Sequence, residues 1–145
     1  MQTISNAEWQ VMRVVWANGQ IKSSEIIAFL QKQQQWSAST IKTLIGRLIN
    51  KSFLTSQKRG RAFIYSAIVD QKAYQKMMVQ ADIEKICQKD HAKLLLELLA
   101  KIPMTASDHQ AFQDLLNERA GTLLEAVPCN CAPGQCQCHP KEGRV

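Results

Sequence analysis

Four cysteines close to the end of the chain are the residues whose type and spacing most clearly allow chemistry. Cys129 and Cys131 are separated by one residue, as are Cys136 and Cys138, and Ala-Pro-Gly-Gln lies between the two pairs. Side chains two positions apart in an extended backbone point to the same side, and Pro-Gly is typical of the centre of a type II turn. Such a turn would fold one pair over the other, so four sulfurs could meet in one small volume.

This pattern predicts a metal site formed by Cys129, Cys131, Cys136 and Cys138. Four thiolates suit Zn(II) as a tetrahedral site, and they also suit Cu(I), which prefers sulfur. Zinc-ribbon sites usually have C-x2-C spacing, and the tighter C-x-C spacing is more compatible with a compact copper–thiolate cluster. The residues alone leave both ions open. The alternative is a cysteine-rich end that traps metal incidentally.

The remaining cysteine and the histidines are weaker candidates. We expect Cys87 to lie in a helix and to be buried rather than ligating. His139 could replace a thiolate, although histidines in a tail are usually bystanders, and His91 and His109 are expected at the surface or at an interface. The sequence has no Gly-rich phosphate loop, nucleophile elbow or H-E-x-x-H motif, so we do not expect an enzyme.

Length and composition limit the class of protein. A chain of 145 residues suits one compact domain, or a small domain followed by a second helical unit. The first residues lack the pattern of a signal peptide, and no run reaches the 18 apolar residues of a membrane-spanning helix, so we predict a cytoplasmic protein without a membrane partner. In that reducing compartment, clustered cysteines favour a metal site over disulfides.

The net charge of +6 is unevenly distributed. Seven Lys or Arg residues and no acidic residue lie between Glu25 and Asp70, whereas the rest of the chain has 11 basic and 12 acidic residues. A local excess of this size suits a polyanion such as nucleic acid. A solvated basic surface without a ligand is the alternative.

Apolar periodicity predicts three helices in this first part, over 5–19, 23–33 and 37–52. Ser5 or Asn6 should cap the first and Ser23 or Ser24 the second. One face of the third helix is apolar, and the opposite face carries Thr40, Lys42, Thr43, Gly46, Arg47, Asn50 and Lys51. Because glycine disfavours a helix, Gly46 indicates either close approach to another surface or close packing in the core.

A β-hairpin should follow, with strands over 53–57 and 62–68 around the basic tip 58–61. Three helices and a basic hairpin are the order of a winged helix-turn-helix, in which the third helix enters the major groove and the wing contacts the flanking backbone. We therefore predict a mainly α fold with a small β-hairpin, in which residues 1–70 form a winged-helix DNA-binding domain. A small α+β domain without a ligand is the alternative.

The rest of the chain is predicted to be helical over 70–87, 91–102 and 105–127, with Thr105 and Asp108 spaced as a capping box. These helices have more leucine than they can bury among themselves. We therefore expect residues 71–127 to form a helical region that makes a homodimer, although these helices could instead fold back on the first domain. Residues 128–145 are the metal-binding tail.

Three segments, ISNAEWQVMRVVW (4–16), SASTIKTLIGRLINK (37–51) and RGRAFIYSA (59–67), resemble the winged-helix domain of the penicillinase-repressor family. With the cysteine pattern added, the chain resembles the copper-responsive, CopY-type repressors of that family, whereas the antibiotic-responsive members lack such a tail. The resemblance implies a homodimer that binds a palindromic TACA/TGTA operator with zinc. It also implies that Cu(I) displaces the zinc, and that release from DNA allows expression of copper-export genes.

Carried over residue by residue, the resemblance places the reading helix at 39–51 and the metal ligands at the four tail cysteines. The predicted DNA-contacting residues are Ser39, Thr40, Lys42, Thr43, Arg47 and Lys51 on this helix and Lys58, Arg59 and Arg61 on the wing. Operator DNA and a second copy of the chain are the expected partners, with a copper-donating chaperone as an option. A copper or zinc buffer, a copper carrier, and a repressor inactivated by proteolysis remain alternatives.

Overall fold

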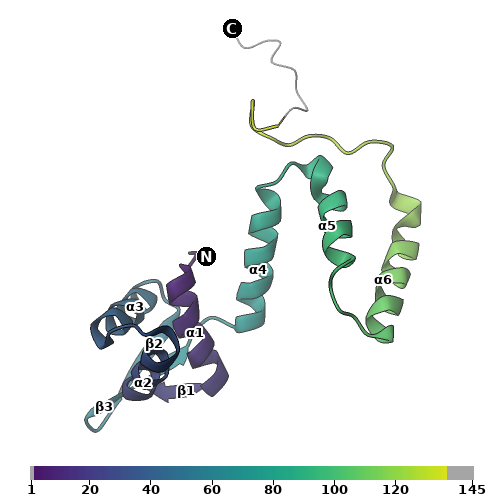
Figure 1. Ribbon diagram of the computed structural model, residues 1–145. Helices are drawn as coiled ribbons and strands as arrows, with labels where there is room; N and C mark the ends of the chain where they lie inside the picture. Colours follow the sequence, from purple (N-terminus) through teal and green to yellow (C-terminus); the bar gives the residue numbers. More distant parts are fainter. Residues whose placement is uncertain (1, 137–145) are drawn as a thin grey trace. The chain divides into compact units, whose positions relative to one another are not determined.

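A computed structural model of the protein describes residues 2–136 (Figure 1). The elements are α1 (Asn6–Asn18), β1 (Gln20–Lys22), α2 (Ser23–Gln34), α3 (Ala38–Asn50), β2 (Leu54–Arg59), β3 (Ala62–Ala67), α4 (Gln71–Glu84), η1 (Gln88–Asp90), α5 (His91–Leu99), α6 (Ala106–Arg119) and η2 (Ala120–Thr122). The predicted fold class, mainly helical with a small antiparallel sheet, is confirmed. Among the described residues, no helix has the length and apolar character needed to cross a bilayer.

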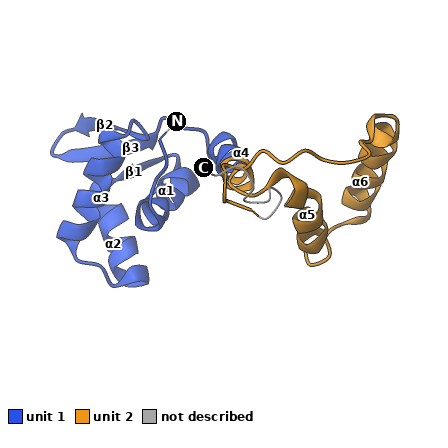
Figure 2. Cartoon of the chain, turned by 90° about the horizontal axis from the view of Figure 1, so that it is seen from above, with its two compact units in different colours: residues 1–78 blue, residues 79–145 orange. Residues whose placement is uncertain are grey.

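The chain divides into two compact units, residues 1–78 and 79–145 (Figure 2). The division falls inside α4, so the first two turns of that helix belong to the first unit.

The ends of α1 and α3 are set by local polar contacts. The hydroxyl of Ser5 accepts a hydrogen bond from the Glu8 backbone N–H, which confirms one of the two predicted caps of α1, and Gly19 ends the helix with a φ of 72°. At α3, the hydroxyl of Ser37 accepts a hydrogen bond from the Thr40 N–H. The Ser37 cap fixes where α3 begins.

The sheet has three antiparallel strands in the order β1-β3-β2. The hairpin was predicted, with β2 longer than expected: Arg59 pairs with Ala62, which leaves Gly60 and Arg61 as the turn. The short strand β1 was not predicted, because three residues are too few to show a period. It also makes the predicted caps of α2 wrong, since Lys22 at the end of β1 is the N-cap residue and Ser23 already lies in the helix.

The core of the first unit is closed by the beginning of α4. Tyr74 is 1% exposed, and its ring packs edge-to-face on Phe53 with 5.2 Å between centroids. Its hydroxyl accepts a hydrogen bond from the Ile4 N–H at 3.1 Å, and the Trp16 indole donates to the Val69 carbonyl at 2.9 Å. The apolar side of α3, including Ile41 and Leu48, is buried in the same core.

A partly buried ion pair links α1 to the end of α3. Glu8 is 2% exposed, and the Nζ of Lys51 lies 2.8 Å and 3.1 Å from its two carboxylate oxygens. The same Nζ donates to the Thr3 carbonyl at 3.3 Å. Lys51 therefore compensates a buried charge, a task that the sequence pattern did not indicate.

The three helices predicted after residue 70 all end earlier in the structure than the sequence indicated. The helix predicted to reach residue 87 ends at Glu84, where the Lys85 and Ile86 N–H groups bond three residues back instead of four. The capping box of Thr105 and Asp108 is present, as predicted. The helix predicted over 105–127 ends as an α-helix at Arg119 and continues only as the 3-10 turn η2, in which Gly121 disfavours further α-helix.

The ion pair generates a stability prediction. Lys51→Met leaves the Glu8 carboxylate buried without its cation, and we expect a loss of about 3 kcal/mol in the free energy of unfolding, measured in urea. Lys42→Met removes the same charge from the exposed side of α3 and serves as the control, with an expected change within about 0.5 kcal/mol. Equal losses in the two variants would show that the pair contributes nothing.

Candidate functional site

The first candidate site is the polar side of α3. Ser39, Thr40, Lys42, Thr43 and Arg47 are all exposed, and four of them line a shallow hollow on the helix surface. The Thr43 hydroxyl donates to the Ser39 carbonyl at 2.9 Å, and the Thr40 and Ser37 hydroxyls lie 2.9 Å apart. These bonds hold the short side chains close to the helix, so Lys42 and Arg47 extend furthest from it.

Lys51 differs from the other predicted DNA-contacting residues of α3. It is half-buried, and its charge faces Glu8. Its contact with DNA stays a prediction, but that contact would compete with the ion pair.

Gly46 lies in the middle of this helix. Apart from its chain neighbours and the backbone of its own helix, a Cβ atom added there would meet no described atom within 4 Å. Close packing within the described chain, one of the two explanations offered by the sequence, therefore does not account for this glycine. Approach of an external surface, the other explanation, stays a prediction.

The wing carries the remaining predicted residues. Lys58, Arg59 and Arg61 are exposed, and Gly60 has a φ of 63° in the two-residue turn between them. Lys58 and Arg59 are consecutive in β2, so their side chains leave opposite faces of the strand. Three helices and a basic wing define the class of protein: this unit is a winged-helix DNA-binding domain.

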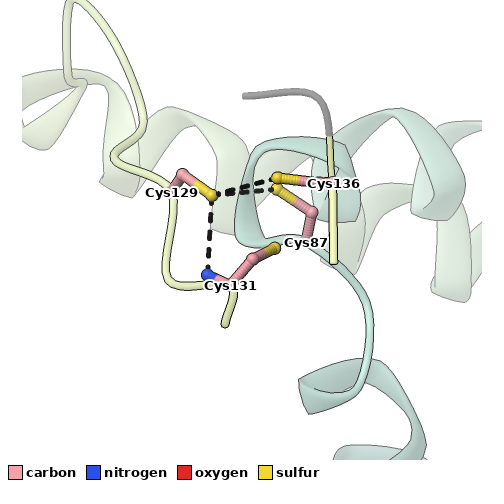
Figure 3. A group of neighbouring side chains, drawn as sticks. All are labelled: Cys87, Cys129, Cys131 and Cys136. Carbon is pink, nitrogen blue, oxygen red and sulfur yellow. Dashed lines mark hydrogen bonds between the residues drawn. The ribbon is translucent and has the colours of Figure 1, made fainter. Parts of the chain in front are cut away.

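The second candidate site is a cluster of sulfur atoms in the second unit. The Sγ atoms of Cys87, Cys129, Cys131 and Cys136 all lie within 4.8 Å of one another, and Figure 3 shows their side chains pointing toward a common centre. Cys129 is 3.4 Å from Cys136 and 3.7 Å from Cys87, measured between sulfurs. This arrangement fits a soft metal ion bound by thiolates. Cys138 and His139 lie outside the described residues.

The predicted turn between the cysteine pairs is present. The Gln135 N–H donates to the Ala132 carbonyl at 3.0 Å, and Gly134 has a φ of 87°, as the third residue of a type II turn requires. The turn returns the chain on itself, and Cys136 thereby reaches Cys129.

Cys87 is the residue of this site that the sequence analysis missed. It is buried, as expected, at 6% exposure, but it lies in the turn after α4 and not in a helix. Cys87 is 42 positions from Cys129, so local spacing could not connect it to the tail cysteines. The one available signal was that Cys87 is the single cysteine of the sequence outside the tail.

The electrostatics of the cluster distinguish its thiols. The Cys131 backbone N–H donates to the Cys129 sulfur at 3.5 Å, which lowers the pKa of Cys129. Burial raises the pKa of Cys131, and hydrogen bonds with Cys87 and Cys136 add to that rise. These opposite directions favour the thiolate form at Cys129 over Cys131, and a bound cation would favour the thiolate form of both.

Comparison with known proteins identifies the family. The family model described as penicillinase repressor matches residues 4–118, so the chain belongs to the penicillinase repressor family, whose members are DNA-binding transcriptional repressors and not enzymes. A 16.5 kDa protein of uncharacterised function, encoded in the ptsI 3′ region of Latilactobacillus sakei, is 39% identical over 96% of this chain and 95% of its own.

Two solved structures are also similar. One is the Bacillus licheniformis BlaI monomer in complex with the blaP half-operator, 41% identical over 50% of this chain and 89% of that chain, with a TM-score of 0.46. The other is a CopR repressor structure, 42% identical over 48% of this chain and all of that chain, with a TM-score of 0.41.

The open space at Gly46 can be tested with one added methyl group. Gly46→Ala should raise the free energy of unfolding by about 1 kcal/mol, because alanine favours the helix. If DNA approaches α3 there, the same variant should bind an operator about tenfold more weakly, by fluorescence anisotropy. Gly121→Ala, also in open space but in the second unit, is the control and should leave affinity unchanged. Unchanged affinity in Gly46→Ala would remove this part of α3 from the interface.

Proposed function

We propose that this chain is a copper-responsive transcriptional repressor. As a zinc-loaded homodimer it binds a palindromic operator through α3 and the wing, and it leaves the DNA when its tail cysteines exchange Zn(II) for Cu(I). The observation that carries the proposal is the convergence of tail sulfurs within 4.8 Å in a chain that also contains a winged-helix domain. A metal-responsive repressor needs a DNA-binding domain and a set of metal ligands in one polypeptide, and cysteine sulfurs are ligands that soft metal ions prefer.

Sulfur chemistry supports copper as the signal. Thiolates bind both Zn(II) and Cu(I), but Cu(I) prefers sulfur more strongly, so the same donors can release one ion for the other. The close C-x-C spacing favours a compact cluster with Cu(I). Cys129, Cys131 and Cys136 are the proposed donors to both ions, and the sequence pattern adds Cys138 as a further donor to Cu(I).

Unburied leucines of the second unit support a homodimer. In α5, Leu96 is 69% exposed, and in α6, Leu116 is 62% exposed. Leu95, Leu98, Leu115, Leu123 and Leu124 are also at least 48% exposed. Apolar side chains in this number favour association, and a two-fold dimer would present two reading helices to a palindromic site.

Charge counting indicates that the signal is geometric. One Zn(II) with four thiolates has a net charge of −2, and two Cu(I) with four thiolates have the same. If those stoichiometries hold, exchange alters the shape of the site and not its formal charge. The salt dependence of DNA affinity should then have nearly the same slope in both metal forms, because that slope counts the phosphates neutralised.

The energy required is within the range of metal binding. Moving a population from 1:99 to 99:1 needs about 5.5 kcal/mol of differential binding. Structural zinc sites in small peptides have apparent binding free energies of roughly 10–16 kcal/mol. If only a fraction of that free energy is coupled to DNA binding, it is enough to shift the population.

A copper or zinc buffer, or a copper carrier, is the second candidate. The described sulfur cluster lies wholly within the second unit, so it could bind metal without affecting the DNA-binding unit. A buffer would bind palindromic and scrambled duplexes alike, with or without metal.

The decisive prediction concerns the operator complex. Zinc-loaded protein should shift a TACA/TGTA palindrome in a gel and not a scrambled duplex. Titration with Cu(I) should release the DNA, and the zinc freed should follow the same curve. A chain truncated after Pro128 is the control: it should no longer respond to Cu(I). If Cu(I) still releases the truncated chain from the operator, the proposal is refuted.

The dimer prediction uses side chains that are exposed in the single chain. Leu96→Ser with Leu116→Ser should convert a dimer to a monomer in sedimentation equilibrium, because the apolar area buried between subunits is lost. The same variant should bind the palindrome more weakly. Ile68→Ser, at 58% exposure in the first unit, is the control and should stay dimeric. A double variant that remains dimeric would place the interface elsewhere.

A further inference from the structure

We propose that Cys87 is a zinc ligand, together with Cys129, Cys131 and Cys136, and that Cys138 is not required in the zinc form. The inference rests on the proposed function for the identity of the metal, but the ligand set is a separate claim with its own test.

The sulfur positions fit one tetrahedral ion. A Zn–S bond of about 2.3 Å places tetrahedral ligands about 3.8 Å from one another. The Cys87–Cys129 and Cys129–Cys136 separations are 3.7 Å and 3.4 Å, and no pair in the cluster exceeds 4.8 Å. Small shifts of side chains would complete the tetrahedron.

Hydrogen bonds on both sides of Cys87 hold the tail in place independently of sulfur. The Gln88 N–H donates to the Asn130 side-chain oxygen at 3.1 Å, and the Gln135 amide donates to the Lys85 carbonyl at 3.0 Å. The oxygen of Gln135 also accepts from the Ala132 N–H at 3.1 Å, which ties this bond to the turn. The residues between the cysteines therefore position the tail against the segment that carries Cys87.

Ordinary burial does not explain this placement. A buried cysteine usually behaves as a small apolar side chain among others. Cys87 does not belong to the apolar core cluster of the first unit, and its sulfur faces the three tail sulfurs (Figure 3). The Cys87 side chain therefore has the position expected of a metal ligand.

Two consequences follow for regulation. Ligation by Cys87 closes a loop within one chain that contains α5 and α6, so zinc would fix both ends of the predicted dimerisation helices. A tetrahedral zinc also uses four of the five cysteines. The thiol of Cys138 is then available to bind an incoming Cu(I) before any zinc ligand is released.

Cadmium-113 can identify the ligands directly in the unaltered chain. The full-length protein loaded with one equivalent of ¹¹³Cd(II), a zinc surrogate, should show scalar coupling from the metal to the Cβ protons of Cys87, Cys129, Cys131 and Cys136. A set of coupled cysteines that omits Cys87 would overturn the proposal.

Matched serine variants give a second measurement. Cys87→Ser should lower zinc affinity by more than about 100-fold, since even supporting residues outside the ligand set cost 10–100-fold, and should change the cobalt(II) spectrum from four-sulfur to three-sulfur coordination. Cys138→Ser should keep zinc affinity within about threefold and the four-sulfur spectrum. Circular dichroism without metal checks the fold of both. Unchanged zinc affinity in Cys87→Ser, or a loss of more than about 100-fold in Cys138→Ser, would refute the assignment.

These measurements separate the two proposals. Zinc coordinated by Cys87 in a protein whose operator affinity ignores metal would support the ligand set and refute the proposed repressor mechanism. If operator affinity responds to metal but the metal shows no scalar coupling to Cys87, the proposed repressor mechanism would be supported and the ligand set refuted.

Discussion

Crowded thiolates repel one another, and this constraint governs the second unit. Four sulfurs within 4.8 Å of one another are unfavourable to ionise together, because like charges at such distances repel, and a cation among them would offset that repulsion. Burial and the neighbouring sulfurs raise the pKa of Cys131, which favours its protonated form when no cation is bound. Under the proposed function, the tail would have two chemical states: protonated thiols joined by weak hydrogen bonds, or thiolates joined by metal.

The two units are connected by a helix that takes part in both. Tyr74 in α4 packs in the core that also buries the apolar side of α3, and α4 ends three residues before Cys87. The same helix therefore contacts α1, through Trp9 and Trp16, and Phe53 by way of Tyr74. If metal exchange regulates the protein as proposed, α4 is a continuous helix through which its effect would reach the first unit.

Sequence patterns predicted what depends on neighbouring residues. The cap at Ser5, the face of α3, the hairpin and the Pro-Gly turn each involve residues within a few positions, so composition and period were sufficient. Tertiary context decided what was missed. β1 exists because three residues pair with β3, Lys51 is drawn to a carboxylate 43 positions away, and Cys87 meets sulfurs beyond two intervening helices. Local sequence patterns contain no information about such contacts between residues that are far apart in the chain.

The position of Tyr74 also has a consequence for how such proteins diversify. A chain cut after Asp70 would lose the ring that covers Phe53 and anchors Ile4, whereas a cut after Met78 would keep both contacts. The natural seam for recombination is therefore inside α4. A different C-terminal unit joined after Met78 would leave the first unit with its complete core, whereas one joined after Asp70 would remove Tyr74 from that core.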